Sequence, residues 1–131
     1  MFHIKQLELV HWDYWRRFNL PLDAQIITIV GPNGSGKTTL LDALRTLFGL
    51  RCSGKRDFRR YVRRANRSFA WIRAVVANKP GSTGKRPFFP CLRDEVTLAC
   101  RIRRAGGDWT RDYAIADGDI SIETLEANAD K

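Results

Sequence analysis

One stretch of the sequence, residues 31–38, has the residue types and the spacing that bind phosphate groups. It reads Gly-Pro-Asn-Gly-Ser-Gly-Lys-Thr and matches the P-loop pattern G-x-x-x-x-G-K-[ST] at every position. Its glycines let backbone amides turn toward a phosphate, and the N-terminus of a following helix adds partial positive charge. In such a loop Lys37 reaches the β- and γ-phosphates, the Thr38 hydroxyl binds Mg²⁺ and Thr39 faces the α-phosphate. The motif therefore predicts that ATP and Mg²⁺ are bound by these residues: Asn33, Gly34, Ser35, Gly36, Lys37, Thr38 and Thr39.

The elements predicted around this loop are those that a P-loop needs. Residues 25–30 are almost continuously apolar and β-branched, as expected for a strand covered on both faces. After the loop, leucine and phenylalanine side chains recur at helical spacing until Gly49, a typical C-terminal cap. Before the loop, the alternation over residues 2–10 predicts a half-buried strand, and residues 17–22 predict a second short strand.

The rest of the chain predicts mainly strands. An amphipathic helix is expected over residues 57–65, a strand over 69–78 and a mobile, turn-rich loop over 79–90. Residues 95–104 and 109–116 predict a hairpin turned at Gly106-Gly107-Asp108, and residues 120–127 predict the beginning of a further helix.

Length and composition fit one globular domain with one core. The chain has 131 residues, of which 44% are hydrophobic, and no run approaches the roughly 20 apolar residues of a membrane span. The N-terminus lacks a secretory apolar core, so the expected compartment is the cytoplasm, without a membrane partner. Cys52, Cys91 and Cys100 form no C-x-x-C pair and are expected to be reduced thiols.

The positive charge is concentrated in one segment. The net charge is +9, and residues 51–73 contain nine arginines and lysines against Asp57 alone, which is a local net charge of +8. Within the predicted helix 57–65 the residues opposite the apolar face are expected to contact DNA phosphates: Arg59, Arg60, Arg63 and Arg64. Lys79, Lys85 and Arg86 can extend the same surface. The alternatives are a solvated face and a face paired with acids from another segment.

Several segments resemble the N-terminal half of SMC-like head ATPases, a group of the ABC superfamily that includes chromosome-organising, break-repair and prokaryotic defence ATPases. The sequence Ile29-Val-Gly-Pro-Asn-Gly-Ser-Gly-Lys-Thr-Thr-Leu-Leu-Asp-Ala-Leu44, followed by Phe48-Gly49, is similar to the Walker A loop and helix of that group. Residues 7–12 resemble its first strand, and residues 95–104 with 113–118 resemble its later strand pair. The resemblance implies an α/β P-loop NTPase fold, in which residues 1–131 form a β-rich N-terminal lobe with an antiparallel β subdomain and few helices.

The resemblance also implies partners. SMC-like heads dimerise around two ATP molecules, hold DNA on the engaged dimer and can carry accessory subunits. A prokaryotic defence protein of the Lamassu kind is the finer interpretation. Residues at the end of the first strand approach adenine and the α-phosphate in this group, which implies a contact from among Asp13, Tyr14, Trp15 and Arg16; packing of Trp12 and Trp15 in the core is the alternative.

The sequence also departs from this group. No four apolar residues are followed by Asp-Glu, the Walker B pattern; Tyr113-Ala-Ile-Ala-Asp117 is followed by Gly118 and is interpreted as the end of a hairpin strand. The signature motif and the Q-loop glutamine are also absent, so no catalytic residue is expected in this chain. We expect a fragment of a longer coiled-coil protein that binds ATP and hydrolyses it only with the missing half of the head.

Two other functions stay open at this point. An ABC transporter nucleotide-binding domain shares the P-loop, and a non-catalytic nucleic-acid-binding module can use one to hold a structural nucleotide. A GTPase is not favoured, because the string nearest to its Asn-Lys-x-Asp base reader, Asn78-Lys79-Pro80-Gly81, lacks the acid.

Overall fold

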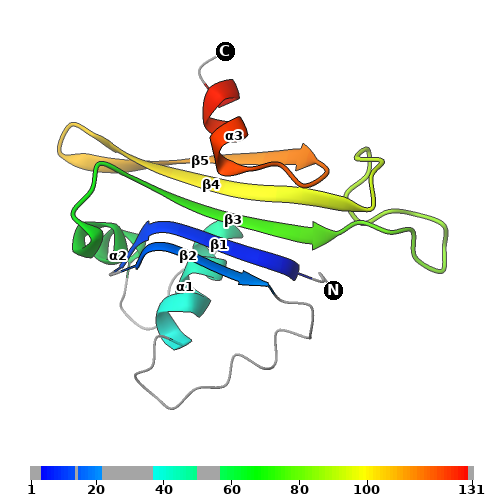
Figure 1. Ribbon diagram of the computed structural model, residues 1–131, viewed down its shortest axis with the longest axis horizontal. Coiled ribbons are helices and arrows are strands. Elements are labelled where there is room, and N and C mark those ends of the chain that lie inside the picture. The colour runs from blue at the N-terminus through cyan, green and yellow to red at the C-terminus, as the bar shows by residue number, and fades with distance from the viewer. Residues whose placement is uncertain (1–3, 14, 22–36, 50–56, 130–131) are drawn as a thin grey trace.

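A five-stranded antiparallel sheet organises the chain. The computed structural model describes residues 4–13, 15–21, 37–49 and 57–129. The strands are β1 (Ile4–Trp12), β2 (Trp15–Pro21), β3 (Phe69–Ala77), β4 (Glu95–Ala105) and β5 (Asp108–Asp117), and they are arranged in the order β2-β1-β3-β4-β5 (Figure 1). Every neighbouring pair is antiparallel. The antiparallel, β-rich arrangement with few helices is as predicted; the expected P-loop strand at residues 25–30 lies outside the described residues.

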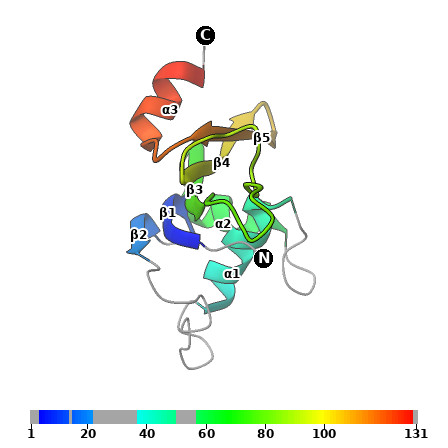
Figure 2. The same cartoon turned by 90° about the vertical axis from the view of Figure 1, so that its right-hand side faces the viewer.

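Within the described residues, three helices cover the two faces of this sheet. Helices α1 (Lys37–Leu47) and α2 (Phe58–Ala65) lie on one face, and α3 (Ile122–Ala129) lies on the other (Figure 2). Strand β3 is sandwiched between the two layers, and its residues from Ala70 to Val76 are all buried. The larger core cluster forms under α1 and α2, and a smaller one centred on Trp71 forms under α3.

Local sequence explains where α2 begins and ends. The Asp57 side chain caps its N-terminus by accepting a hydrogen bond from the Arg59 N–H at 2.9 Å. At the C-terminus Asn66 adopts the left-handed conformation, with φ of 54°, which asparagine tolerates better than most residues. The apolar face consists of Phe58, Tyr61 and Val62, all buried as the helical spacing predicts.

The other predicted elements are found within a few residues of their expected positions. One detail of the hairpin was wrong: Asp108 pairs with Ala105 and begins β5, so the turn consists of Gly106 and Gly107 alone. Cys91 and Cys100 are free thiols as predicted, and Cys52 lies outside the described residues. Among the helices described, none is long and apolar enough to cross a membrane.

Candidate nucleotide site and basic surface

The P-loop helix begins at the lysine of the motif. Helix α1 starts at Lys37, so Thr38 and Thr39 lie in its first turn, where backbone N–H groups have no partner within the helix. This start fits a phosphate and a phosphate-bound Mg²⁺, because the partial positive charge of the helix is located there. The other predicted phosphate ligands, Asn33 to Gly36, lie outside the described residues, as do the side chains of residues 37–41.

Side-chain hydrogen bonds fix α1 in place. The carboxylate of Asp42, which is fully buried, accepts a short hydrogen bond from the Tyr61 hydroxyl of α2 and a second one from Arg45 at 3.3 Å. One turn later the Tyr113 hydroxyl of β5 donates to the Thr46 carbonyl at 3.1 Å. The acid on this helix therefore has a structural role: it joins the P-loop helix to α2.

The turn after β1 was predicted to approach the nucleotide. Trp12 is fully buried and stacks on Tyr61, with ring centroids 4.8 Å apart, so it belongs to the core. Asp13, in the left-handed region with φ of 56°, donates its N–H to the Tyr61 carbonyl at 2.9 Å and accepts from Arg64 at 3.3 Å. Arg16 is exposed on β2. Of the other two candidates, Tyr14 and the side chain of Trp15 lie outside the described residues.

The four arginines predicted to bind DNA are not equivalent. Arg59 donates to Asp108 at 2.8 Å and also binds Asp57, and the hydrogen bond from Arg59 is the main cause that holds the pKa of Asp108 below its ordinary value. Arg64 pairs with Asp13. Arg60 and Arg63 are exposed, and no carboxylate in the described part of the chain pairs with either of them. These two carry the uncompensated charge of the helix.

The same basic surface continues onto the β4–β5 hairpin, which sequence reasoning missed. Arg111 of β5 lies over the Phe58 ring of α2, with its guanidinium carbon 4.4 Å from the ring centroid. Arg104 lies on the same face of β4 as Ile102, because side chains alternate along a strand, and its N–H donates to Ser68 just after α2. The pairing between β4 and β5 brings these residues close to α2. No local sequence pattern predicts this proximity.

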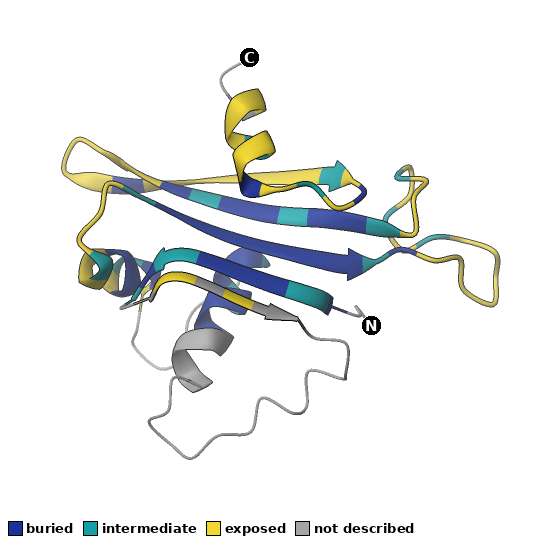
Figure 3. Cartoon of the chain, in the orientation of Figure 1, coloured by how far each residue is buried: buried dark blue, intermediate teal, exposed yellow. Residues whose placement is uncertain are grey.

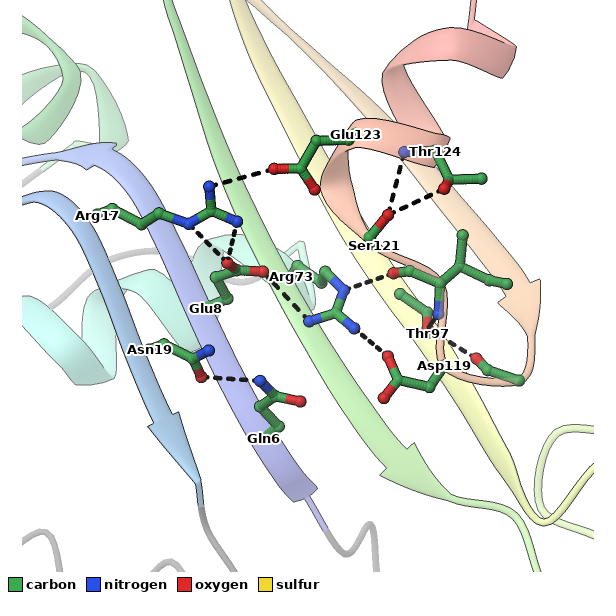
Figure 4. Close-up of polar contacts among 12 residues, drawn as sticks. Gln6, Glu8, Arg17, Asn19, Arg73, Thr97, Asp119, Ser121, Glu123 and Thr124 are labelled. Carbon is green, nitrogen blue, oxygen red and sulfur yellow. Dashed lines mark hydrogen bonds and ion pairs between the residues drawn. The ribbon is translucent and has the colours of Figure 1, made fainter.

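Arg73 is the last of the nine basic residues in the segment 51–73, but it does not belong to the exposed basic surface. Its side chain is only 5% exposed and binds Glu8 at 3.2 Å, Asp119 at a shorter distance and the Ile120 carbonyl (Figure 4). Arg17 of β2 binds the same Glu8 at 2.6 Å and reaches Glu123 of α3. This ion-pair network ties the α3 segment to strands β1, β2 and β3, on the sheet face opposite α2.

The interpretation of residues 113–117 as the end of a hairpin strand is confirmed. They form the last part of β5, antiparallel to β4. The Asp117 carboxylate accepts the backbone N–H groups of Leu92 and Arg93 at 3.0 and 2.9 Å, and these bonds lower its pKa. Asp117 is therefore a structural cap of the neighbouring loop. Asn78 has a similar role: its side chain is fully buried and donates hydrogen bonds to two carbonyls of that loop.

A protein family and a known protein are similar to parts of this chain. Residues 4–55 match the family described as the P-loop containing region of AAA domain. A stretch of 84 residues, 63% of this chain, is 43% identical to the chromosome partition protein Smc of Synechococcus sp. (strain ATCC 27144 / PCC 6301 / SAUG 1402/1). Together the two matches support the resemblance of this chain to the P-loop region and the N-terminal head fragment of SMC-like proteins. The matched stretch spans only 6% of the length of that Smc protein.

Proposed function

We propose that this chain is the ATP-binding N-terminal lobe of an SMC-like head, which dimerises around ATP and acts on DNA. The observation that carries the proposal is the complete P-loop motif within the matched region 4–55, with α1 beginning at its lysine. Lys37 would bind the β- and γ-phosphates, Thr38 would bind Mg²⁺, and backbone amides of the loop would surround the phosphates.

Hydrolysis would need residues from outside this chain. A carboxylate that orients the attacking water is required, and the nearest candidate, Asp117, is occupied as a cap of backbone N–H groups. The proposed source is a second half of the head, which follows a coiled coil and carries the Walker B and signature motifs. In a head dimer the partner's signature motif would contact the γ-phosphate, so that ATP joins the two heads.

The DNA part of the proposal rests on α2. Arg60 and Arg63 are exposed and uncompensated within the described residues, whereas Arg59 and Arg64 are engaged in ion pairs. Exposed arginines on one helix face contact phosphates without reading sequence, which suits a protein that holds DNA nonspecifically. The relative's name, chromosome partition protein, agrees with a role on DNA. The narrower assignment to a defence ATPase of the Lamassu kind rests on the sequence resemblance alone.

Isothermal titration calorimetry tests the nucleotide site. The wild-type chain should show a heat of Mg²⁺-ATP binding, and Lys37→Ala should abolish it. Lys79→Ala removes the same charge from an exposed position after β3 and should bind ATP as the wild type does. Unchanged ATP affinity in Lys37→Ala would refute the site and favour the alternative of a nucleic-acid-binding module.

A salt titration tests the DNA surface. If Arg60 and Arg63 each contact one phosphate, the double change Arg60→Gln with Arg63→Gln should weaken duplex DNA binding and flatten the slope of log K against log salt concentration by about 1.8. The matched control is Arg101→Gln with Arg103→Gln, which share Asp112 on the opposite sheet face. Equal effects of the two double variants would mean that α2 is only a solvated face.

A further inference from the structure

The loop of residues 79–94 forms a second basic surface, separate from α2. Helix α2 precedes the beginning of β3 and this loop follows its end, so the two lie at opposite ends of the strand (Figure 1). Nine residues of strand span about 30 Å. Lys79, Lys85 and Arg86 therefore do not extend the α2 surface, contrary to the sequence expectation.

Hydrogen bonds to Asn78 determine the shape of this loop, which the sequence led us to expect as mobile. The Asn78 side chain donates to the carbonyls of Cys91 and Arg93 at 2.9 Å each and accepts the N–H of Phe88 at 2.7 Å. Arg86 bridges the Asn78 carbonyl and Asp94. With Asp117 capping the end of the loop, its backbone is tied to the sheet at several points.

This anchored loop presents apolar side chains to solvent. Phe89 is 77% exposed and Leu92 is 68% exposed, more than any other large hydrophobic residue described. The loop itself is almost wholly exposed beyond the end of β3 (Figure 3). Both side chains are available to a partner, and a fixed loop loses little conformational entropy when a partner binds.

The charges around these two side chains specify the chemistry of the partner. Residues 79–94 contain four basic residues against Asp94, a net charge of +3. Arg86 is paired with Asp94, which leaves Lys79, Lys85 and Arg93, each exposed and without an ion pair to any described residue. An exposed aromatic ring on the same loop as three exposed cations matches a polyanion that also offers flat apolar faces.

We propose that this loop binds unpaired nucleotides, with a base stacked on Phe89 and the adjoining phosphates bound by Lys79, Lys85 and Arg93. Stacking on an aromatic ring needs a base that is free of its duplex, and basic side chains that follow the backbone provide the rest of the affinity. Duplex DNA with all its bases paired offers only its phosphates to such a loop, except at its ends. The loop therefore distinguishes single-stranded tails and frayed ends from continuous duplex, which the α2 arginines do not.

Fluorescence anisotropy with two labelled DNAs of the same duplex sequence tests this inference on the full chain. One is a covalently closed duplex circle, which has no ends and no unpaired bases, and the other is the same duplex in linear form with a thymidine tail of about 10 nucleotides, within the usual site size of single-strand binders. The wild type should prefer the tailed DNA. Phe89→Ala should weaken tailed-DNA binding by about 5- to 150-fold, the loss expected for one base stack, and should leave binding to the closed circle unaffected.

Two controls make the result decisive. Phe89→Tyr keeps an aromatic ring and should keep the preference for the tail, and thermal unfolding of Phe89→Ala should match the wild type because the side chain is exposed. An unchanged tail preference in Phe89→Ala overturns the inference. So does Phe89-dependent binding to phosphatidylserine vesicles without any tail preference, which would identify a membrane surface instead. If Arg60→Gln with Arg63→Gln weakens both DNAs while Phe89→Ala weakens neither, the proposed DNA function stands and this inference alone fails.

Discussion

Replacing Tyr61 by phenylalanine tests the hydrogen bond that joins α2 to the P-loop helix. The variant removes only the hydroxyl group, because a phenylalanine ring can keep the stacking on Trp12. The hydroxyl donates to Asp42, and both residues are buried, with 2% and 0% of their surface exposed. Hydrogen bonds to charged groups contribute about 1.5–3 kcal/mol, so we expect this loss in the free energy of unfolding.

Urea denaturation followed by far-ultraviolet circular dichroism measures that loss. With a typical slope of about 2 kcal/mol per molar urea, the midpoint should fall by about 1 M without a change in slope. Tyr113→Phe is the matched control: it removes a hydroxyl that also bonds to α1, at 3.1 Å, but its acceptor is the neutral Thr46 carbonyl and the tyrosine is half exposed. Its cost should stay near 0.5–1 kcal/mol, roughly the range of a neutral hydrogen bond. Equal midpoints for the two variants would refute the reasoning.

Three further predictions follow from the described contacts. Arg73→Met should destabilise the fold by about 3 kcal/mol in the same assay, because Glu8 stays buried with only Arg17, whereas Arg103→Met at an exposed pair should cost less than about 1 kcal/mol. The lowered pKa of Asp117 means that its contribution to stability is present above the ordinary value of 3.8 and is lost as pH falls through the lower folded value. Asp117→Asn should therefore lose less stability than the wild type on acidification, and similar losses would contradict the capping role. Burial raises the pKa of the Cys100 thiol to about 11, so iodoacetamide at pH 8 should modify Cys91 well before Cys100, as peptide mass spectrometry can show.

Local patterns in the sequence predicted most of the elements. The alternation in β1, the turn residues of the hairpin and the apolar face of α2 all depend on neighbours within a few positions. The partners of charged residues could not be predicted in this way. Arg59 meets Asp108 49 residues away and Arg73 meets Glu8 65 residues away, through a strand order that no short-range pattern encodes.

The candidate sites also differ in whether their residues are close together in the sequence. The P-loop is a contiguous motif, so residues 31–38 alone are enough to predict its chemistry. The basic surface is assembled from α2 and the β4–β5 hairpin, and its extension to Arg111 depends on the register that pairs Ile102 with that residue. Phe89 was also missed. The only local signal was an aromatic pair between two prolines, and its exposure follows from how Asn78 folds the loop.

The structure also decides which arginines can be changed without disturbing the fold. Arg59 and Arg64 join α2 to Asp108 and Asp13, so reversing their charge would place like charges together at contacts between elements. Arg60 and Arg63 are exposed on a helix whose position is set by its caps and by buried Phe58, Tyr61 and Val62. If all four arginines were changed to glutamate in one variant, a loss of DNA affinity could come either from the lost positive charge or from unfolding. The pair Arg60 and Arg63 isolates the electrostatic contribution, because neither side chain has a carboxylate partner in the described part of the chain whose loss could weaken the fold.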